Sequence, residues 1–316
     1  MSSVSASRSG SGSGSGEHLV DVGHGITLCY ERFGDPSDPP LLLIMGLGQQ
    51  LLAWPDAFVQ GLVARGFQVV IFDNRDVGRS THATNRPPRL TQLMIRRFDD
   101  DQYDLGDLTD DAAGLLDALD LRPAHVVGVS MGGMIAQTLA ARYPDHVRSL
   151  VSIMSSTGVA NAGWVAPSTL RLLMTAPPRD REAAAERAVK MFRHIGSAGF
   201  PFDEQSIRER SLRAYDRDPR GAVGTGRQMA AILKSGNRTD ELQGITAPTL
   251  VIHGDRDRMV HPSGGRATAR AIPGARLVTI EGMGHDLPAG AFSRLVELIG
   301  DHATQADQAR QSPAAA

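Results

Sequence analysis

The sequence predicts an α/β fold, in which a doubly wound, mostly parallel β-sheet carries an inserted helical cap. Short, continuously apolar runs alternate along the chain with stretches of helical spacing, as expected when helices cover both faces of a parallel sheet. Residues 155–242 interrupt this alternation with helical patterns and no convincing apolar strand. In a chain of 316 residues, the interruption is read as an insertion into one α/β domain.

The α/β core is expected to comprise residues 17–154 and 243–302. Met1–Gly16 is almost entirely Ser and Gly and is predicted to be a disordered tail. Residues 303–316, rich in Ala and Gln, are expected to form a second disordered tail.

Turn and helix-stop residues delimit the elements before the insertion. Gly23–Gly25 separates the first two strands, residues 34–40 form a dense turn, Gly66 ends a helix and Pro144 stops another. The expected strands are 19–22, 26–33, 41–45, 67–73, 125–129 and 147–154, and the expected helices are 54–65, 107–119 and 131–143.

The insertion and the rest of the core follow the same periodicities. Helices are expected at 181–194, 205–216 and 222–233 within the insertion, followed by a strand at 249–253, a helix at 263–272, a strand at 276–280 and a helix at 292–299. Such a cap is expected to lie over the carboxyl ends of the strands, where open α/β sheets bind ligands.

Charge and cysteine content exclude several classes of protein. The 33 Lys and Arg residues against 35 Asp and Glu give a net charge of −2, which argues against a nucleic-acid partner. The single Cys29 forms no internal disulfide and is expected to be a small buried side chain. No apolar run approaches the ~18 residues of a membrane span, and no secretory leader is recognisable, so a cytoplasmic protein is expected.

The pentapeptide Gly128-Val-Ser-Met-Gly132 is the strongest chemical signal. A predicted strand runs directly into Ser130 and a predicted helix starts at Met131. A sharp strand-to-helix turn exposes a serine hydroxyl above the sheet, and flanking glycines let the turn close. Ser130 is therefore the candidate nucleophile, although a serine that merely caps a helix is the alternative.

A nucleophilic serine needs a base and an acid that orients the base, and in this type of fold both follow the serine along the chain. His285, in a glycine-bounded loop after the last predicted strand, is the candidate base, with His253 as a competitor. Asp257 is the favoured acid, and Asp255 or Asp286 are the alternatives. A metal site at these residues is not expected, because a second ligand cluster is lacking, and no cofactor is expected.

Acyl transfer also requires backbone donors for the developing oxyanion. One candidate is the N–H of Met131, directly after the nucleophile. The other is the N–H of Leu47, in the glycine-containing loop Met45-Gly-Leu-Gly48 that follows a predicted strand.

Together the G-x-S-M-G-G motif, the loop His253-Gly-Asp-Arg-Asp257, the run Gly282-Met-Gly-His-Asp-Leu-Pro288 and Phe72-Asp-Asn-Arg-Asp-Val-Gly-Arg-Ser80 resemble the α/β-hydrolase superfamily. The chain is similar to its carboxylesterase branch, which includes aclacinomycin methylesterase-like proteins, although Met45-Gly46 stands where many relatives have His-Gly. The resemblance implies the same triad of Ser130, Asp257 and His285. It also implies a structural turn; the residues of that turn are Asp73, Arg75, Gly78 and Ser80.

The expected function is hydrolysis of small carboxylic esters through an acyl-enzyme. Leu, Met and Phe residues of the insertion favour short to medium acyl groups and broad tolerance. Hydrolysis of lactones, thioesters or C–C bonds, and perhydrolysis, use the same triad and remain alternatives. A non-catalytic small-molecule binder is the alternative from a different class.

Overall fold

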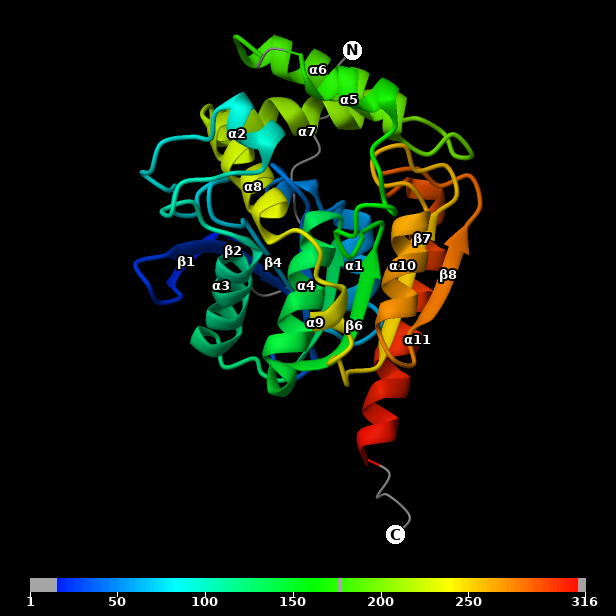
Figure 1. The fold of residues 1–316 in the computed structure, drawn as a ribbon. Coiled ribbons are helices and arrows are strands. Elements are labelled where there is room, and N and C mark those ends of the chain that lie inside the picture. Colours follow the sequence, from blue (N-terminus) through cyan, green and yellow to red (C-terminus); the bar gives the residue numbers. More distant parts are fainter. Residues whose placement is uncertain (1–15, 176–177, 312–316) are drawn as a thin grey trace, which may run out of the picture.

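The computed structural model describes residues 16–175 and 178–311 and contains one eight-stranded sheet (Figure 1). The strands lie in the order β1-β2-β4-β3-β5-β6-β7-β8. β1 and β2 pair antiparallel, β2 is antiparallel to β4, and all other pairs are parallel. The predicted mostly parallel α/β sheet is thus confirmed. The strands are β1 His18–Asp21, β2 Thr27–Phe33, β3 Pro40–Ile44, β4 Gln68–Phe72, β5 Ala124–Val129, β6 Val147–Ile153, β7 Thr249–Gly254 and β8 Arg276–Ile280.

Helices cover both faces of the sheet, each over its own apolar core. On one face α1 (Asp56–Val63) and α11 (Phe292–Gln311) pack on the sheet, and on the other α3 (Leu105–Ala118), α4 (Met131–Arg142) and α10 (Ser263–Ala271) do so. Successive residues of a strand alternate between the two cores. In β3, for example, Leu41 and Leu43 enter one core, and Leu42 and Ile44 the other.

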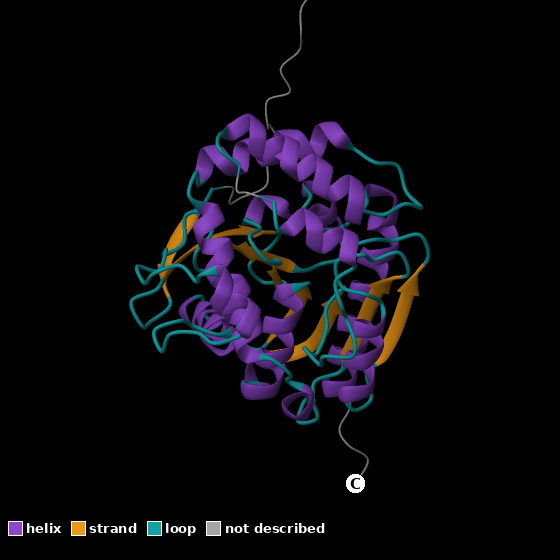
Figure 2. Ribbon diagram, turned by 45° about the horizontal axis from the view of Figure 1, so that its top comes forward, coloured by secondary structure: helices purple, strands orange, loops and turns teal. Residues whose placement is uncertain are grey.

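Between β6 and β7, the residues that the structure describes form helices and no strand. We call residues 155–242 the inserted segment. It contains α5 (Pro167–Leu173), α6 (Arg181–Ile195), α7 (Glu204–Arg217), α8 (Gly221–Ser235) and the short α9 (Thr239–Leu242). Helices α5 to α8 lie together at one end of the sheet, beyond the carboxyl ends of the central strands (Figures 1 and 2).

The prediction of a loose tail from Ala303 is wrong for residues 303–311. Helix α11 continues without a break to Gln311. Ala303 and Ala306 are buried, and Asp307 lies within ion-pair distance of His125 and Arg148. The predicted Ser/Gly tail lies, except for Gly16, outside the described residues, as do residues 312–316.

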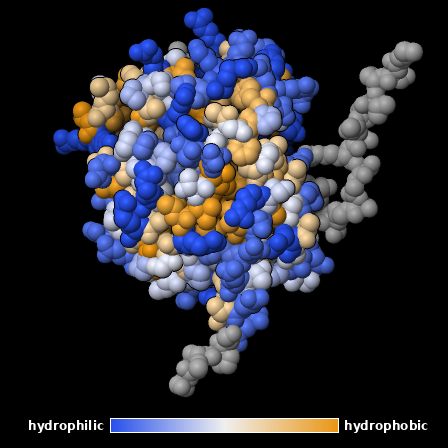
Figure 3. All heavy atoms as spheres, turned by 90° about the vertical axis from the view of Figure 1, so that its right-hand side faces the viewer, coloured by the Kyte–Doolittle hydropathy of each residue, from blue (hydrophilic) through white to orange (hydrophobic). Residues whose placement is uncertain are grey.

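The periodicity did not reveal several short elements: α2 (Leu90–Ile95), α5, α9 and three 3₁₀ turns. On the side shown in Figure 3, hydrophobic residues form patches among hydrophilic ones. Of the helices in the described ranges, none has both the length and the apolar character that a membrane span requires.

Candidate active site

Ser130 occupies a strained position between β5 and α4. Its φ of 56° lies in the left-handed region, which side-chain-bearing residues rarely adopt. A Cβ at Gly128 would lie 2.1 Å from the carbonyl oxygen of Gly132, so this turn closes only around glycine. The Ser130 N–H donates to the Ile153 carbonyl (2.9 Å), and its own carbonyl accepts from Ser155 Oγ (2.8 Å). The strand-to-helix turn expected from the sequence is present.

Ser130, His285 and Asp257 form a continuous hydrogen-bonded chain. His285 Nε2 lies 3.0 Å from Ser130 Oγ, and His285 Nδ1 lies 2.7 Å from Asp257 Oδ2. The three residues come from loops after β5, β8 and β7, whose carboxyl ends lie at the same edge of the sheet. Residues 155 positions apart in the sequence therefore meet at hydrogen-bond distance.

Asp257 is buried, and both oxygens of its carboxylate have hydrogen-bond partners. Its Oδ1 accepts from the N–H groups of Met259 and Val260, each at 2.8 Å. Burial acts to raise the pKa of the carboxyl, but the charge of His285 and hydrogen bonds from His253 and His285 outweigh it and hold the pKa well below its usual range. The carboxylate is thus ionised and aimed at His285.

The competing residues have other partners. Asp255 Oδ1 accepts from the Gly282 N–H at 2.7 Å, and Asp286 Oδ1 accepts from Ser197 Oγ at 2.5 Å. His253 Nε2 lies 2.8 Å from the carbonyl oxygen of Val260 and 3.4 Å from Asp257 Oδ2. Of these three residues, only His253 contacts the hydrogen-bonded chain of Ser130, His285 and Asp257, and it does so at Asp257.

The loop after β3 lies against Ser130. A Cβ at Gly46 would be 3.1 Å from Ser130 Cβ, and the half-buried Leu47 follows directly. No hydrogen bond among the described residues uses the Leu47 N–H. Met131 begins α4, and the first N–H groups of a helix have no intrahelical acceptor. Both predicted donors are therefore close to the serine.

The turn after β4 is held by its own polar residues. The buried Asp73 accepts from the N–H groups of Leu51 (2.7 Å) and Arg79 (3.0 Å) and pairs with Arg217. Ser80 Oγ donates to the Asp73 carbonyl. These contacts agree with the structural role that the resemblance implies.

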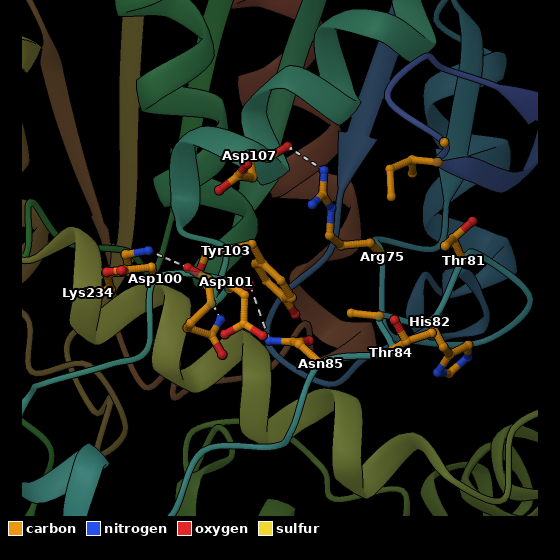
Figure 4. A pocket seen from close by; sticks show the side chains of 14 residues that line it. Arg75, Thr81, His82, Thr84, Asn85, Asp100, Asp101, Tyr103, Asp107 and Lys234 are labelled. Atoms are coloured by element: carbon orange, nitrogen blue, oxygen red, sulfur yellow. Dashed lines mark hydrogen bonds between the residues drawn. The ribbon is translucent and has the colours of Figure 1, made fainter.

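A separate hollow of about 520 Å³ is lined in part by Asp100, Asp101 and Asp107 (Figure 4), and Ser130, His285 and Asp257 are not among the residues that line it. The two cationic side chains that line the hollow already have partners within the protein. Arg75 pairs with Asp111, and Lys234 donates to the Gln102 carbonyl. In the described ranges, no group of three or more His, Cys, Asp or Glu side chains could hold a metal ion.

Sequence reasoning missed two side chains next to the loop after β3. Asn74 Nδ2 donates to the Met45 carbonyl (3.1 Å), and Gln228 Oε1 accepts from the Gly48 N–H (2.8 Å). Asn74 lies within the run Phe72–Ser80, which carries part of the resemblance to the α/β-hydrolase superfamily. Gln228 lies in α8 without any local signal.

Comparisons with known proteins agree with this architecture. Residues 39–289 match the family described as alpha/beta hydrolase fold. The chain is 33% identical over 300 residues to the rhodomycin D methylesterase DnrP of Streptomyces peucetius, covering 88% of this chain and 95% of that protein. It is 30% identical to the 2-hydroxymuconate semialdehyde hydrolase of Pseudomonas sp. strain CF600, covering 85% and 88% of the two chains.

A solved structure gives the same result for the fold. The enol-lactonase from Burkholderia xenovorans LB400 superposes with a TM-score of 0.70 at 23% identity, over 91% of this chain and all of that one (100%). The chain belongs to the α/β-hydrolase fold family, because the family model matches most of its length and the relatives are similar to it over most of theirs.

Proposed function

We propose that this protein is a serine hydrolase that cleaves carboxylic esters through an acyl-enzyme. The observation that carries the proposal is the hydrogen-bonded chain from Ser130 Oγ through His285 to the buried Asp257 carboxylate. A serine hydroxyl is a weak nucleophile without such a base, and the base needs an acid to fix its tautomer.

In the first half of the reaction, Ser130 Oγ attacks the ester carbonyl carbon while His285 Nε2 takes the hydroxyl proton. Asp257 accepts a hydrogen bond from His285 Nδ1–H and stabilises the imidazolium. The N–H groups of Leu47 and Met131 stabilise the oxyanion. When the tetrahedral intermediate collapses, the ester C–O bond breaks and His285 gives its proton to the leaving alcohol.

In the second half, water replaces the alcohol. His285 takes a proton from the water as its oxygen attacks the acyl carbon, and a second tetrahedral intermediate forms. Its collapse breaks the bond to Ser130 Oγ, and His285 returns the proton to the serine. The products are the carboxylic acid and the free enzyme.

The substrate is proposed to be a small-molecule ester held under the inserted segment, which would act as a cap. Support comes from contacts of that segment with the loop of the base: the His285 N–H donates to the Ile195 carbonyl (2.7 Å) and the Gly284 N–H to Ser197 Oγ (2.8 Å). The 33% sequence identity to a methylesterase favours a methyl ester as the substrate.

The test is hydrolysis of p-nitrophenyl esters from acetate to laurate, together with covalent labelling by a fluorophosphonate. Ser130→Ala is expected to lower kcat at least about 10⁴-fold and to abolish labelling, because the nucleophile is lost. The exposed α7 residue Ser206 supplies the control, Ser206→Ala, which is expected to behave as wild type. A folded Ser130→Ala enzyme that keeps substantial turnover would contradict the assignment.

C–C bond hydrolysis is the second candidate, because the chain is 30% identical over most of its length to the 2-hydroxymuconate semialdehyde hydrolase. The two candidates differ in the leaving group, which is an alkoxide in ester hydrolysis and a carbanion in C–C bond hydrolysis. Wild-type labelling by fluorophosphonate without turnover of any ester, methyl esters included, would favour C–C hydrolysis. Absence of both labelling and turnover would favour a non-catalytic binder.

A further inference from the structure

We propose that Gln228, on helix α8 of the inserted segment, is a positioning residue that orients the Leu47 N–H toward the oxyanion. This inference rests on the proposed function, because it concerns a donor in that reaction. Gln228 does not contact the reacting atoms. It acts on the loop after β3, through the peptide group next to the one that carries the Leu47 N–H.

The peptide group between Gly46 and Leu47 is held at its own carbonyl. The Gly46 carbonyl accepts from the Gln49 N–H at 3.1 Å. In a trans peptide the C=O and N–H point in opposite directions. A rotation of this peptide would break the Gln49 bond, so the bond also sets the direction of the Leu47 N–H.

The two neighbouring peptide groups are held by side chains from outside the loop. On one side, Asn74 Nδ2 donates to the Met45 carbonyl at 3.1 Å. On the other side, the Gly48 N–H donates to Gln228 Oε1 at 2.8 Å. The peptide that carries the candidate donor is therefore bracketed, with Gln228 as the anchor on its C-terminal side.

Gln228 is itself held rigidly. It has no exposed surface, and its Nε2 donates to the Arg75 carbonyl at 2.8 Å. Both polar atoms of the amide are thus used, one on the loop after β3 and one on the turn after β4. A rigid acceptor is what the Gly48 N–H needs if the loop is to keep one conformation.

Helix α8 also packs directly against the loop after β3. Gly48 has a φ of +66°, and a Cβ there would lie 2.5 Å from Thr225 Oγ1, one turn before Gln228. The loop therefore depends on the inserted segment for both its shape and its hydrogen bonding. Loss of Gln228 would free Gly48, and the Leu47 N–H would lose its fixed direction although the serine, histidine and aspartate stay in place.

The test is Gln228→Met, which keeps the length of the side chain and removes both hydrogen bonds. Gln102→Met is the matched control: Gln102 is also buried and ties α8 to the body, since its Nε2 donates to the Arg227 carbonyl at 3.2 Å. Three quantities are measured for p-nitrophenyl esters: kcat, KM, and the inhibition constant of an aryl trifluoromethyl ketone, whose adduct with the serine carries an oxyanion.

Gln228→Met is expected to lower kcat about 10- to 100-fold, less than the 10²–10³-fold that follows complete loss of an oxyanion donor. Its KM should change little, and inhibitor affinity should fall in parallel with kcat/KM, because only the oxyanion uses this N–H. Gln102→Met should leave all three quantities unchanged.

The proposal is overturned if Gln228→Met keeps the wild-type kcat and inhibitor affinity, or if Gln102→Met loses as much of both. If Gln228→Met fails to fold, Asn74→Leu tests the other side of the bracket, with the same selective loss expected and a wild-type kcat contradicting the idea. A wild-type enzyme that neither hydrolyses esters nor takes up fluorophosphonate would instead contradict the proposed function.

Discussion

The pKa values of two buried acids of this protein shift in opposite directions, because their partners differ. Burial alone raises the pKa of a carboxyl or a thiol. At Asp257, two histidines and two backbone N–H groups surround the charged form, and the pKa falls. At Cys29, burial dominates, the nearby Asp73 charge adds to it, Arg217 opposes it, and the pKa rises to about 12.

Cys29 is therefore expected to be inert in the native protein. With a pKa of about 12, only about one part in 10⁴ of the thiol is thiolate at pH 8, and the side chain has no exposed surface. Ellman's reagent at pH 8 should release no thionitrobenzoate from the native protein and one equivalent after unfolding in guanidinium chloride. Stoichiometric reaction of the native protein within minutes would contradict this expectation.

Helix α11 shows how an element gains its length from distant partners. Residues 303–311 contain few large apolar side chains, so their composition indicates a loose tail. In the folded protein, Ala303 and Ala306 are buried, and Asp307 lies 3.2 Å from His125 Nε2 on β5 and 3.4 Å from Arg148 Nη1 on β6. The helix continues because the sheet offers these partners.

Removal of residues 303–316 is accordingly expected to destabilise the protein. Two buried alanine methyls contribute about 0.8 kcal/mol each, and a buried histidine that loses its partner costs about 1–3 kcal/mol, so the free energy of unfolding should fall by about 3–5 kcal/mol. Urea unfolding measures this change. A chain that lacks only residues 312–316 is the reference for the comparison, and an equal stability of both truncations would contradict the argument.

For the molecule as a whole, the sequence predicted those features that local patterns determine. Pro123 directly precedes β5 and Pro144 lies three residues before β6, and the limits of both strands were predicted to within a residue. That Ser130, Asp257 and His285 lie together could be predicted because each follows a strand, and parallel strands end at the same edge of the sheet. Gln228 could not be found, since its partners Gly48 and Arg75 are 180 and 153 positions away and no pattern in α8 marks it.

Global stability is expected to decline as the pH falls below about 6.5, because two buried histidines resist protonation. Burial lowers the pKa of His125, against the opposing effect of Asp307, and lowers the pKa of His302, against the opposing effect of the Pro248 carbonyl. In the unfolded chain a histidine binds its proton near pH 6.5. The stability that the neutral rings contribute is thus complete above that pH and is lost as the pH falls through their lower folded-state values.

The variant His302→Gln separates this effect from general acid sensitivity. A glutamine can still donate to the Pro248 carbonyl, which lies 3.1 Å from His302 Nε2, but it cannot take up a proton. Between pH 6.5 and 5.5 the free energy of unfolding should fall less steeply than in wild type, by up to about 1.4 kcal/mol per pH unit. Because the acid-sensitive ring joins α11 to the segment before β7, equal slopes in His302→Gln and wild type would mean that this contact does not couple protonation to unfolding.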